Sequence, residues 1–170
     1  FQRRILENIA IRYPTIIEEM YSAAITAGTE IMDVYSKSDF GVETKSDNSP
    51  VTLADKIADK VIKDILKSKF HNIPIASEES HGDLNSLMGE TYFLVDPLDG
   101  TKEFIKKTGE FTVNIALILN ERAELGVVYV PVTGELYYRD LNGASYLEQG
   151  LNAAGGRSER TKISCREADL

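Results

Sequence analysis

Between residues 92 and 147, short apolar runs alternate with turn residues, and this pattern limits the possible folds more than any other feature. Closely spaced runs of this kind predict strands joined by tight turns, as in an antiparallel meander. Two of the runs lie in "ELGVVYVPVTGELYY", on either side of a turn at 131–134. The expected strands cover residues 73–76, 92–95, 111–119, two runs within 124–138, and 144–147, and one more begins at 161.

Two long stretches ahead of most of these strands have the spacing of amphipathic helices. The first covers residues 13–35. The second covers residues 52–69 and carries Leu53, Ile62 and Leu66 on its apolar side. The polar segment between them predicts a loop, with a short strand at residues 40–44.

Two helices and about six mostly antiparallel strands predict an α+β fold. We expect a layered α/β sandwich in which the two long helices pack on an antiparallel sheet. A chain of 170 residues, of which 42% are apolar, can form one such core.

Composition narrows the class of protein. The chain has 27 acidic and 19 basic residues and a net charge of −8. This charge argues against binding to nucleic acid and is compatible with binding of cations. A single cysteine, Cys165, allows no internal disulfide and favours a reducing compartment. No run approaches the ~18 apolar residues of a membrane span. We therefore expect a cytoplasmic protein.

The strand at 92–95 runs into the motif "DPLDGT". Asp96 stands where the strand reaches the surface, and Pro97 has no amide hydrogen, so we expect the strand to stop there and the chain to turn. In that turn the Leu98 carbonyl can face the same side as the Asp96 and Asp99 carboxylates. Oxygen ligands of this kind suit Mg²⁺ or Mn²⁺.

The end of the motif offers a site for an anion. Gly100 permits close backbone approach, and Thr101 can cap a short helix begun by "KEFIKK". The free amides and the positive dipole end of that helix suit a phosphate. A cation beside an anion pocket is what metal-assisted hydrolysis of a phosphate ester requires. The alternative is a strand, a proline turn and a helix cap with two solvated aspartates.

Spacing excludes two similar motifs. A Ca²⁺-binding EF-hand loop needs Asp at positions one and three and Glu at position twelve. With Asp96 at position one, position three is Leu98 and position twelve is Lys107, so the motif is absent. Phosphatases with an aspartyl nucleophile carry D-x-D-G-T, whereas here two residues separate the acids. The spacing favours a metal site over a covalent aspartyl-phosphate.

A second acidic element is "IPIASEES", in which a short apolar strand leads into Ser77, Glu78 and Glu79. Two strands that both end in acids would bring those ends together in a shared sheet. The alternative is an exposed acidic turn.

A third element is "SPVTLADK", in which Thr52 and Asp55 have the spacing of a capping box. Capping alone would explain Asp55. A carboxylate there could also act in a general base, with the Thr101 hydroxyl as a relay. The local sequence leaves both interpretations open.

Together, "SDNSPVTLAD", "SEES" and "VDPLDGTKEFIKKTGEFTVNIALI" resemble the lithium-sensitive, Mg²⁺-dependent phosphomonoesterase superfamily, which includes the inositol monophosphatases. The extension "KEFIKKTGEFTVNIALI" and the later "LGVVYVPVTGELYY" look most like its bacterial 3′(2′),5′-bisphosphate nucleotidase branch. The resemblance covers about residues 15–148.

The resemblance implies a role for each matching residue. It implies that Mg²⁺ is held by Glu78, Asp96, the Leu98 carbonyl and Asp99, and that Mn²⁺ could serve in its place. It also implies that Glu78 helps to orient the attacking water.

The same resemblance assigns the catalytic and substrate contacts. Asp55 and Thr101 match the pair that activates the water. The backbone of Gly100 and Thr101 matches the phosphate-binding helix start. Substrate contacts would therefore come from Glu78, Leu98, Asp99, Gly100 and Thr101.

The resemblance implies hydrolysis of the 3′-phosphate of adenosine 3′,5′-bisphosphate to give AMP. The phosphosulfate analogue of this nucleotide is a possible second substrate. This would place the protein in sulfur metabolism and make it sensitive to lithium. Water would displace the alcohol in line, without a covalent intermediate. One alternative is an inositol or other sugar phosphate as substrate, and another is a non-catalytic metal-binding module.

The family pattern also predicts a division of the chain. Residues 1–155 would form an N-terminal α+β catalytic domain, and residues 156–170 would begin a C-terminal α/β domain. Family members carry a "WD" motif in that second domain, whose Asp completes the metal site, and this chain has no tryptophan. We therefore expect the fifth ligand beyond Leu170, and weak metal binding and little turnover for this piece. The sequence does not decide the oligomeric state.

Overall fold

The computed structural model describes residues 2–37, 39–44, 50–79, 87, 89–139, 143–151 and 159–164, with side chains from residue 15 onward. The predicted domain boundary at residue 155 and Cys165 lie outside these ranges. Within them, no helix is both long and apolar enough to cross a membrane.

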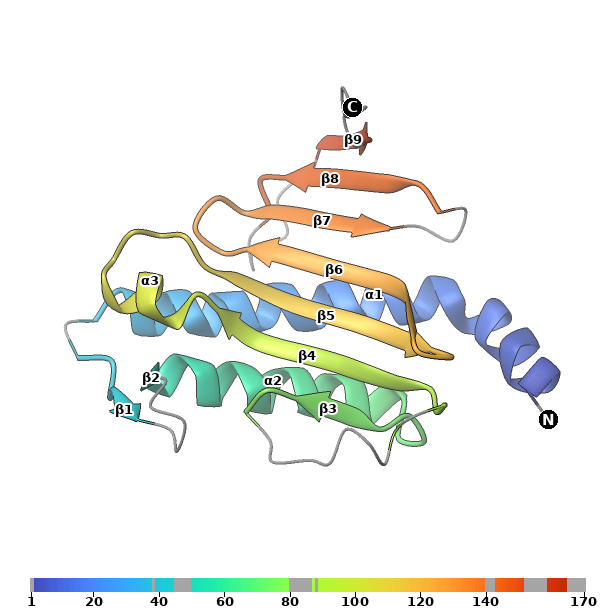
Figure 1. Cartoon of the computed structure of the whole chain (residues 1–170). Helices are drawn as coiled ribbons and strands as arrows, with labels where there is room; N and C mark the ends of the chain where they lie inside the picture. The colour runs from blue at the N-terminus through green and yellow to red at the C-terminus, as the bar shows by residue number, and fades with distance from the viewer. Residues whose placement is uncertain are drawn as a thin grey trace, which may run out of the picture.

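A seven-stranded sheet forms one layer, with its strands in chain order from β3 to β9 (Figure 1). β3 is parallel to β4, and every later pair of neighbours is antiparallel. The strands are β3 (Ile75–Ser77), β4 (Tyr92–Asp99), β5 (Thr112–Leu119), β6 (Arg122–Val130), β7 (Glu135–Arg139), β8 (Ser145–Gln149) and β9 (Glu159–Ile163). The predicted antiparallel meander is thus confirmed.

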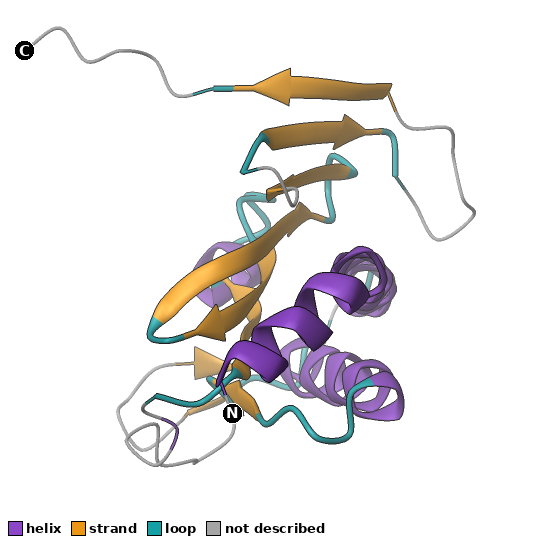
Figure 2. Cartoon of the chain, turned by 90° about the vertical axis from the view of Figure 1, so that its right-hand side faces the viewer, coloured by secondary structure: helices purple, strands orange, loops and turns teal. Residues whose placement is uncertain are grey.

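Two long helices form the second layer. α1 (Gln2–Tyr35) crosses β5 and β6, and α2 (Leu53–Lys69) packs along β4. Both helices lie on the same side of the sheet (Figure 2). A two-stranded pairing of β1 (Glu43–Thr44) with β2 (Pro50–Val51) precedes α2, and the short α3 (Thr101–Ile105) follows β4. The predicted α+β class is confirmed.

The core lies between the helices and the sheet, and strand alternation supplies its sheet side. Along β5, Val113, Ile115 and Leu117 point into the core, while the intervening residues stay partly exposed. The helices contact each other closely because small residues stand at their interface, including Ala24 on α1 and Ala58 on α2.

Two sequence-based expectations need correction. Leu53 lies outside the core and is 44% exposed, because the buried face of α2 runs through Ala54 and Ala58 to Ile62. β4 does not stop at Pro97 but continues to Asp99, which pairs with Thr112. The register shifts between Asp96 and Asp99, so the proline sits in an irregularity where the ladder needs no amide donor.

Some boundaries also differ from the predicted ones. α1 begins at Gln2, β1 covers only two residues, and β9 begins at Glu159. β9 pairs with β8 as the outermost strand of the same sheet.

Candidate active site

Asp55 is a buried carboxylate at the start of α2. Only 1% of the residue is exposed. The predicted capping box is present: the Thr52 side chain caps the helix, and the Thr52 N–H donates to Asp55 Oδ2 at 2.7 Å. The Thr52 hydroxyl donates to the same oxygen at 2.6 Å. One oxygen of Asp55 is therefore committed to the cap.

The other oxygen of Asp55 faces the start of α3. The Thr101 hydroxyl donates to Asp55 Oδ1 at 3.0 Å, across 46 residues of sequence. The Leu98 carbonyl lies 3.3 Å from the same hydroxyl and could also accept its proton. A hydroxyl has one proton, and the shorter contact favours Asp55 as the acceptor. The capping role and the contact with Thr101 thus occur together.

The turn into α3 depends on Gly100. Its φ of 98° lies in the left-handed region. A Cβ atom there would lie 2.7 Å from the Glu110 carbonyl oxygen. A side chain is excluded by both conformation and space, and the backbone just before β5 passes close to the turn.

Phe104 anchors α3 after this turn. It is fully buried. Its ring lies 5.1 Å from that of Tyr35, 5.2 Å from that of Phe40 and 5.2 Å from that of Phe111, measured between centroids. The aromatic cluster fixes the short helix against α1, and with it the position of Thr101.

Glu78 and Asp96 meet at adjacent strand ends. β3 runs parallel to β4, with Ser77 opposite Val95, and the Glu78 N–H donates to the Val95 carbonyl at 3.0 Å. The Glu78 side chain lies close enough to Asp96 to raise the pKa of that carboxyl group. The prediction that a shared sheet brings the two acidic ends together is confirmed.

Asp96 is unusual because its charge is poorly compensated. Burial, the negative charges of Glu78 and Asp99, and the hydrogen bond with Glu78 raise its pKa to about 7, while the Leu98 amide acts in the opposite direction. Its Oδ1 is buried and has no hydrogen-bond partner. Neighbouring carboxylates repel each other, and a proton or a bound cation between them would relieve that repulsion.

Asp99 is exposed and turns toward the neighbouring strand β5. The Asn114 amide lies 3.3 Å from Asp99 Oδ2, and the Thr112 hydroxyl donates to Asn114 Oδ1 at 3.1 Å. Sequence reasoning assigned no role to Asn114. A polar residue inside the apolar run "FTVNIALIL" was the signal that could have marked it.

The described part of the chain contains no three Asp, Glu, His or Cys side chains already gathered as a metal centre. Glu78 and Asp96 are in contact, whereas Asp99 is held toward Asn114. The unpartnered oxygen of Asp96 and the all-oxygen donor set nevertheless fit a hard divalent cation. The donors that could hold it are Glu78, Asp96, Asp99 and the Leu98 carbonyl.

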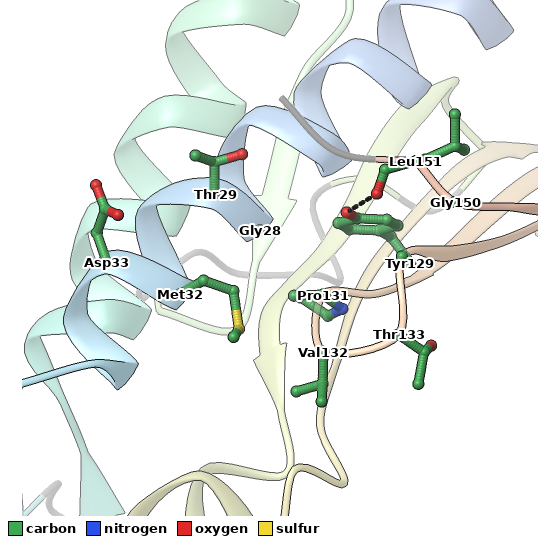
Figure 3. A pocket seen from close by; sticks show the side chains of 11 residues that line it. Gly28, Thr29, Met32, Asp33, Tyr129, Pro131, Val132, Thr133, Gly150 and Leu151 are labelled. Atoms are coloured by element: carbon green, nitrogen blue, oxygen red, sulfur yellow. Dashed lines mark hydrogen bonds between the residues drawn. The ribbon is translucent and has the colours of Figure 1, made fainter. Parts of the chain in front are cut away.

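A pocket of about 490 Å³ lies elsewhere, between α1 and the turn after β6 (Figure 3). Its lining includes Met32, Tyr129 and Leu151, and none of the predicted site residues. The Tyr129 hydroxyl donates to the Leu151 carbonyl at 3.0 Å. This pocket is separate from the acidic site.

Curated proteins similar to this chain are named as nucleotidases. The 3′(2′),5′-bisphosphate nucleotidase CysQ of Escherichia coli (strain K12) is 47% identical over 124 residues, which are 72% of this chain and 50% of that protein. CysQ of Buchnera aphidicola subsp. Acyrthosiphon pisum is 44% identical over 157 residues, or 91% of this chain and 57% of that protein. The chain thus spans about half the length of these curated relatives.

Solved structures and a family profile that match this chain point to the same group of proteins. CysQ from Bacteroides thetaiotaomicron superposes with a TM-score of 0.72 and 40% identity, covering 91% of this chain and 60% of that one. An inositol monophosphatase from Anabaena (Nostoc) sp. PCC 7120 superposes with a TM-score of 0.66 and 27% identity, covering 80% and 48%. The profile of the inositol monophosphatase family matches residues 13–168. By sequence and by fold, the chain belongs to the inositol monophosphatase family.

Proposed function

We propose that this chain carries most of the catalytic groups of a Mg²⁺-dependent phosphatase that removes the 3′-phosphate of adenosine 3′,5′-bisphosphate. The observation that carries the proposal is Asp96, whose buried and unpartnered oxygen lies beside Glu78. In a purely structural aspartate, each carboxylate oxygen would be exposed to water or hydrogen-bonded within the protein. A carboxylate that binds a cation would instead keep an oxygen free for that cation.

The proposed cation site is formed by Glu78, Asp96, the Leu98 carbonyl and Asp99. Mg²⁺ or Mn²⁺ bound there would polarise the phosphate and stabilise the charge that develops on the leaving oxygen. Asn114 keeps the Asp99 carboxylate in place beside that site.

Asp55 and Thr101 are the proposed general base and its relay. The attacking water would give its proton to the Thr101 hydroxyl as that hydroxyl passes its own proton to Asp55 Oδ1, 3.0 Å away. The burial of Asp55 and its two bonds from Thr52 hold the carboxylate in one orientation.

The proposed phosphate contacts lie at the start of α3. The amides of Gly100 and Thr101 open that helix, where the first backbone N–H groups would donate to a phosphate. Glu78, Leu98 and Asp99 would contact the same phosphate group through their proximity to the cation. The substrate is a small phosphate ester.

Identity with the named nucleotidases favours the nucleotide over an inositol phosphate. The test is phosphate release from adenosine 3′,5′-bisphosphate and from inositol 1-phosphate with Mg²⁺, with and without lithium. It should be run on this chain and, for reference, on the CysQ of Escherichia coli (strain K12). We expect preference for the nucleotide, inhibition by lithium, and lower turnover than the reference protein, of which this chain spans about half.

Two results would change the proposal. A preference for inositol 1-phosphate would move the substrate to the sugar phosphates. Hydrolysis of neither ester with Mg²⁺ or Mn²⁺ would favour a non-catalytic metal-binding module. Asp99→Asn separates an enzyme from a protein in which this acid is only structural. The enzyme would lose Mg²⁺-dependent turnover while keeping its fold, whereas loss of a structural acid would mainly change stability.

A further inference from the structure

Ser77 is a buried polar residue that the proposed mechanism does not use. It ends β3, and only 6% of it is exposed. Its hydroxyl donates to Asp59 Oδ1 of α2 at 2.5 Å and accepts a longer bond from the Glu79 N–H at 3.4 Å. The segment that carries Glu78 is thereby joined to α2.

Asp59 is itself held by an ion pair within the helix. Lys63 Nζ lies 2.6 Å from Asp59 Oδ2, and the two side chains are only 19% and 15% exposed. The neighbouring pair Lys60–Asp64 has the same spacing, but its side chains are 77% and 64% exposed. Exposed pairs hold their side chains weakly, whereas a shielded pair with a second hydrogen bond keeps Asp59 in one orientation.

The Ser77–Asp59 bond joins the two elements that carry the candidate catalytic groups. Asp59 follows Asp55 by one helical turn, on the same face of α2. Ser77 directly precedes Glu78. A change in this bond would therefore alter the position of Glu78 relative to both Asp55 and Asp96.

We propose that Ser77 and Asp59 are positioning residues that hold Glu78 where a divalent cation binds. This inference rests on the proposed function, in which Glu78 is a metal ligand. Residues that orient metal ligands typically contribute about 10- to 100-fold to metal affinity. Because Ser77 acts through the backbone and not on the ligand oxygens, we expect a loss of about tenfold, at the lower end of that range.

The test is a titration of this chain with Mn²⁺, monitored by electron paramagnetic resonance. The variants are Ser77→Ala and Asp59→Ala. The matched controls on α2 are Asp64→Ala, which removes the exposed ion pair, and Ser68→Ala, which removes the hydroxyl that donates to the Ile65 carbonyl at 2.8 Å. Urea unfolding of each variant measures stability separately.

Asp59→Asn tests the hydrogen bond apart from the charge. An asparagine oxygen can still accept from the Ser77 hydroxyl, although the attraction to Lys63 is lost. We expect Asp59→Asn to keep most of the Mn²⁺ affinity that Asp59→Ala loses. A purely structural contribution of the ion pair would instead make the two variants alike.

The expected result is weaker Mn²⁺ binding by Ser77→Ala and Asp59→Ala, with both controls unchanged. Lower stability with unchanged Mn²⁺ affinity in those two variants would overturn the positioning role and leave the proposed function standing. Failure of the parent protein to bind Mn²⁺ would overturn the proposed function itself, and this inference with it.

Discussion

At the scale of single residues, Asp96 combines a cost in stability with a proposed role in binding. Its pKa is raised from 3.8 to about 7, chiefly by burial and by Glu78. Because the pKa is higher in the folded state, the stability that Asp96 contributes is fully present below pH 3.8, its pKa in the unfolded chain. That contribution is lost as pH rises through about 7. The metal-free protein should therefore become less stable between pH 4 and pH 7 because of this residue.

Asp96→Asn should remove that cost. At pH 8 without divalent metal, we expect the variant to be more stable than the parent by about 1–2 kcal/mol, since solvent screens part of the effect. We also expect it to lose the rise in melting temperature that Mg²⁺ causes in the parent. Thermal unfolding with and without Mg²⁺ measures both. A variant that is less stable at pH 8 and still responds to Mg²⁺ would show Asp96 to be structural.

Thr101 allows a similar test of the relay to Asp55. Thr101→Val keeps the shape of the side chain and removes its hydroxyl. Loss of a positioned proton-transfer group typically lowers the rate about 10²- to 10⁴-fold, whereas loss of one hydrogen bond costs about 1 kcal/mol of stability. We expect kcat to fall by at least 10²-fold.

Thr26→Val is the control for Thr101→Val. The Thr26 hydroxyl also donates to a backbone carbonyl, that of Ser22, on the exposed side of α1. Its loss should leave kcat unchanged. A Thr101→Val enzyme with kcat close to that of the control would exclude the relay.

At the scale of elements, α1 approaches β6 closely at Gly28 (Figure 3). A Cβ atom on Gly28 would lie 2.4 Å from a ring carbon of Tyr129, whose hydroxyl is held by Leu151. Gly28→Ala should therefore destabilise the fold. Overpacking costs about 1–3 kcal/mol, and the better helix propensity of Ala returns about 1 kcal/mol.

Gly126→Ala is the matched control in β6 itself, because no atom lies within 4 Å of the Cβ position there. We expect it to match the parent or to exceed it slightly in stability. Urea unfolding of both variants measures the difference. Equal stability of the two would show that the Tyr129 ring moves aside at little cost.

The pairing of β7 with β8 predicts a loss of stability in alkali. The Tyr138 hydroxyl donates to Glu148 at 2.9 Å, and burial together with this bond raises the pKa of Tyr138 to about 12. The unfolded chain ionises first, so the stability is present below pH 10 and is lost as pH rises through about 12. Tyr138→Phe should reduce this loss by about 1 kcal/mol at pH 11, measured by urea unfolding at pH 9 and pH 11.

Tyr21 limits the size of that effect. Burial and Tyr138 raise its pKa as well, so part of the alkaline loss should remain in Tyr138→Phe. An unchanged pH dependence in the variant would assign the whole effect to Tyr21 or to other groups.

At the scale of the whole molecule, local pattern predicted those features that depend on near neighbours. Strand alternation predicted the meander, and the spacing of Thr52 and Asp55 predicted a capping box that the structure contains. The prediction that the strand stops at Pro97 was wrong. A shift in the register between β4 and β5 lets β4 continue past the proline.

Contacts between distant segments were beyond the reach of local pattern. The bond between Ser77 and Asp59 spans 18 residues, and that between Asn114 and Asp99 spans 15. Each joins two elements whose relative position only the complete sheet and helix layer determines. The motifs therefore indicated the candidate ligands, while the residues that orient them emerged only from the fold.

The face of the sheet opposite α1 and α2 leads to a prediction about association. Leu94 is 40% exposed and Val128 is 39% exposed. Leu94 pairs with Ala116, which pairs with Gly126, and Val128 follows Gly126 by two residues, opposite Asn114. Exposed apolar side chains on one face of a sheet favour association. We expect this chain by itself to self-associate through that face at high concentration.

The double variant Leu94→Thr and Val128→Thr should remain monomeric at concentrations where the parent associates, as measured by sedimentation velocity. Both threonines are compatible with strands, so the sheet should be preserved. Val42→Thr is the control, because Val42 is 52% exposed but lies in the loop before α2, away from this face. Association that persists in the double variant would place the contact elsewhere. Loss of association in the control as well would mean that total exposed apolar surface, and not this face, drives it.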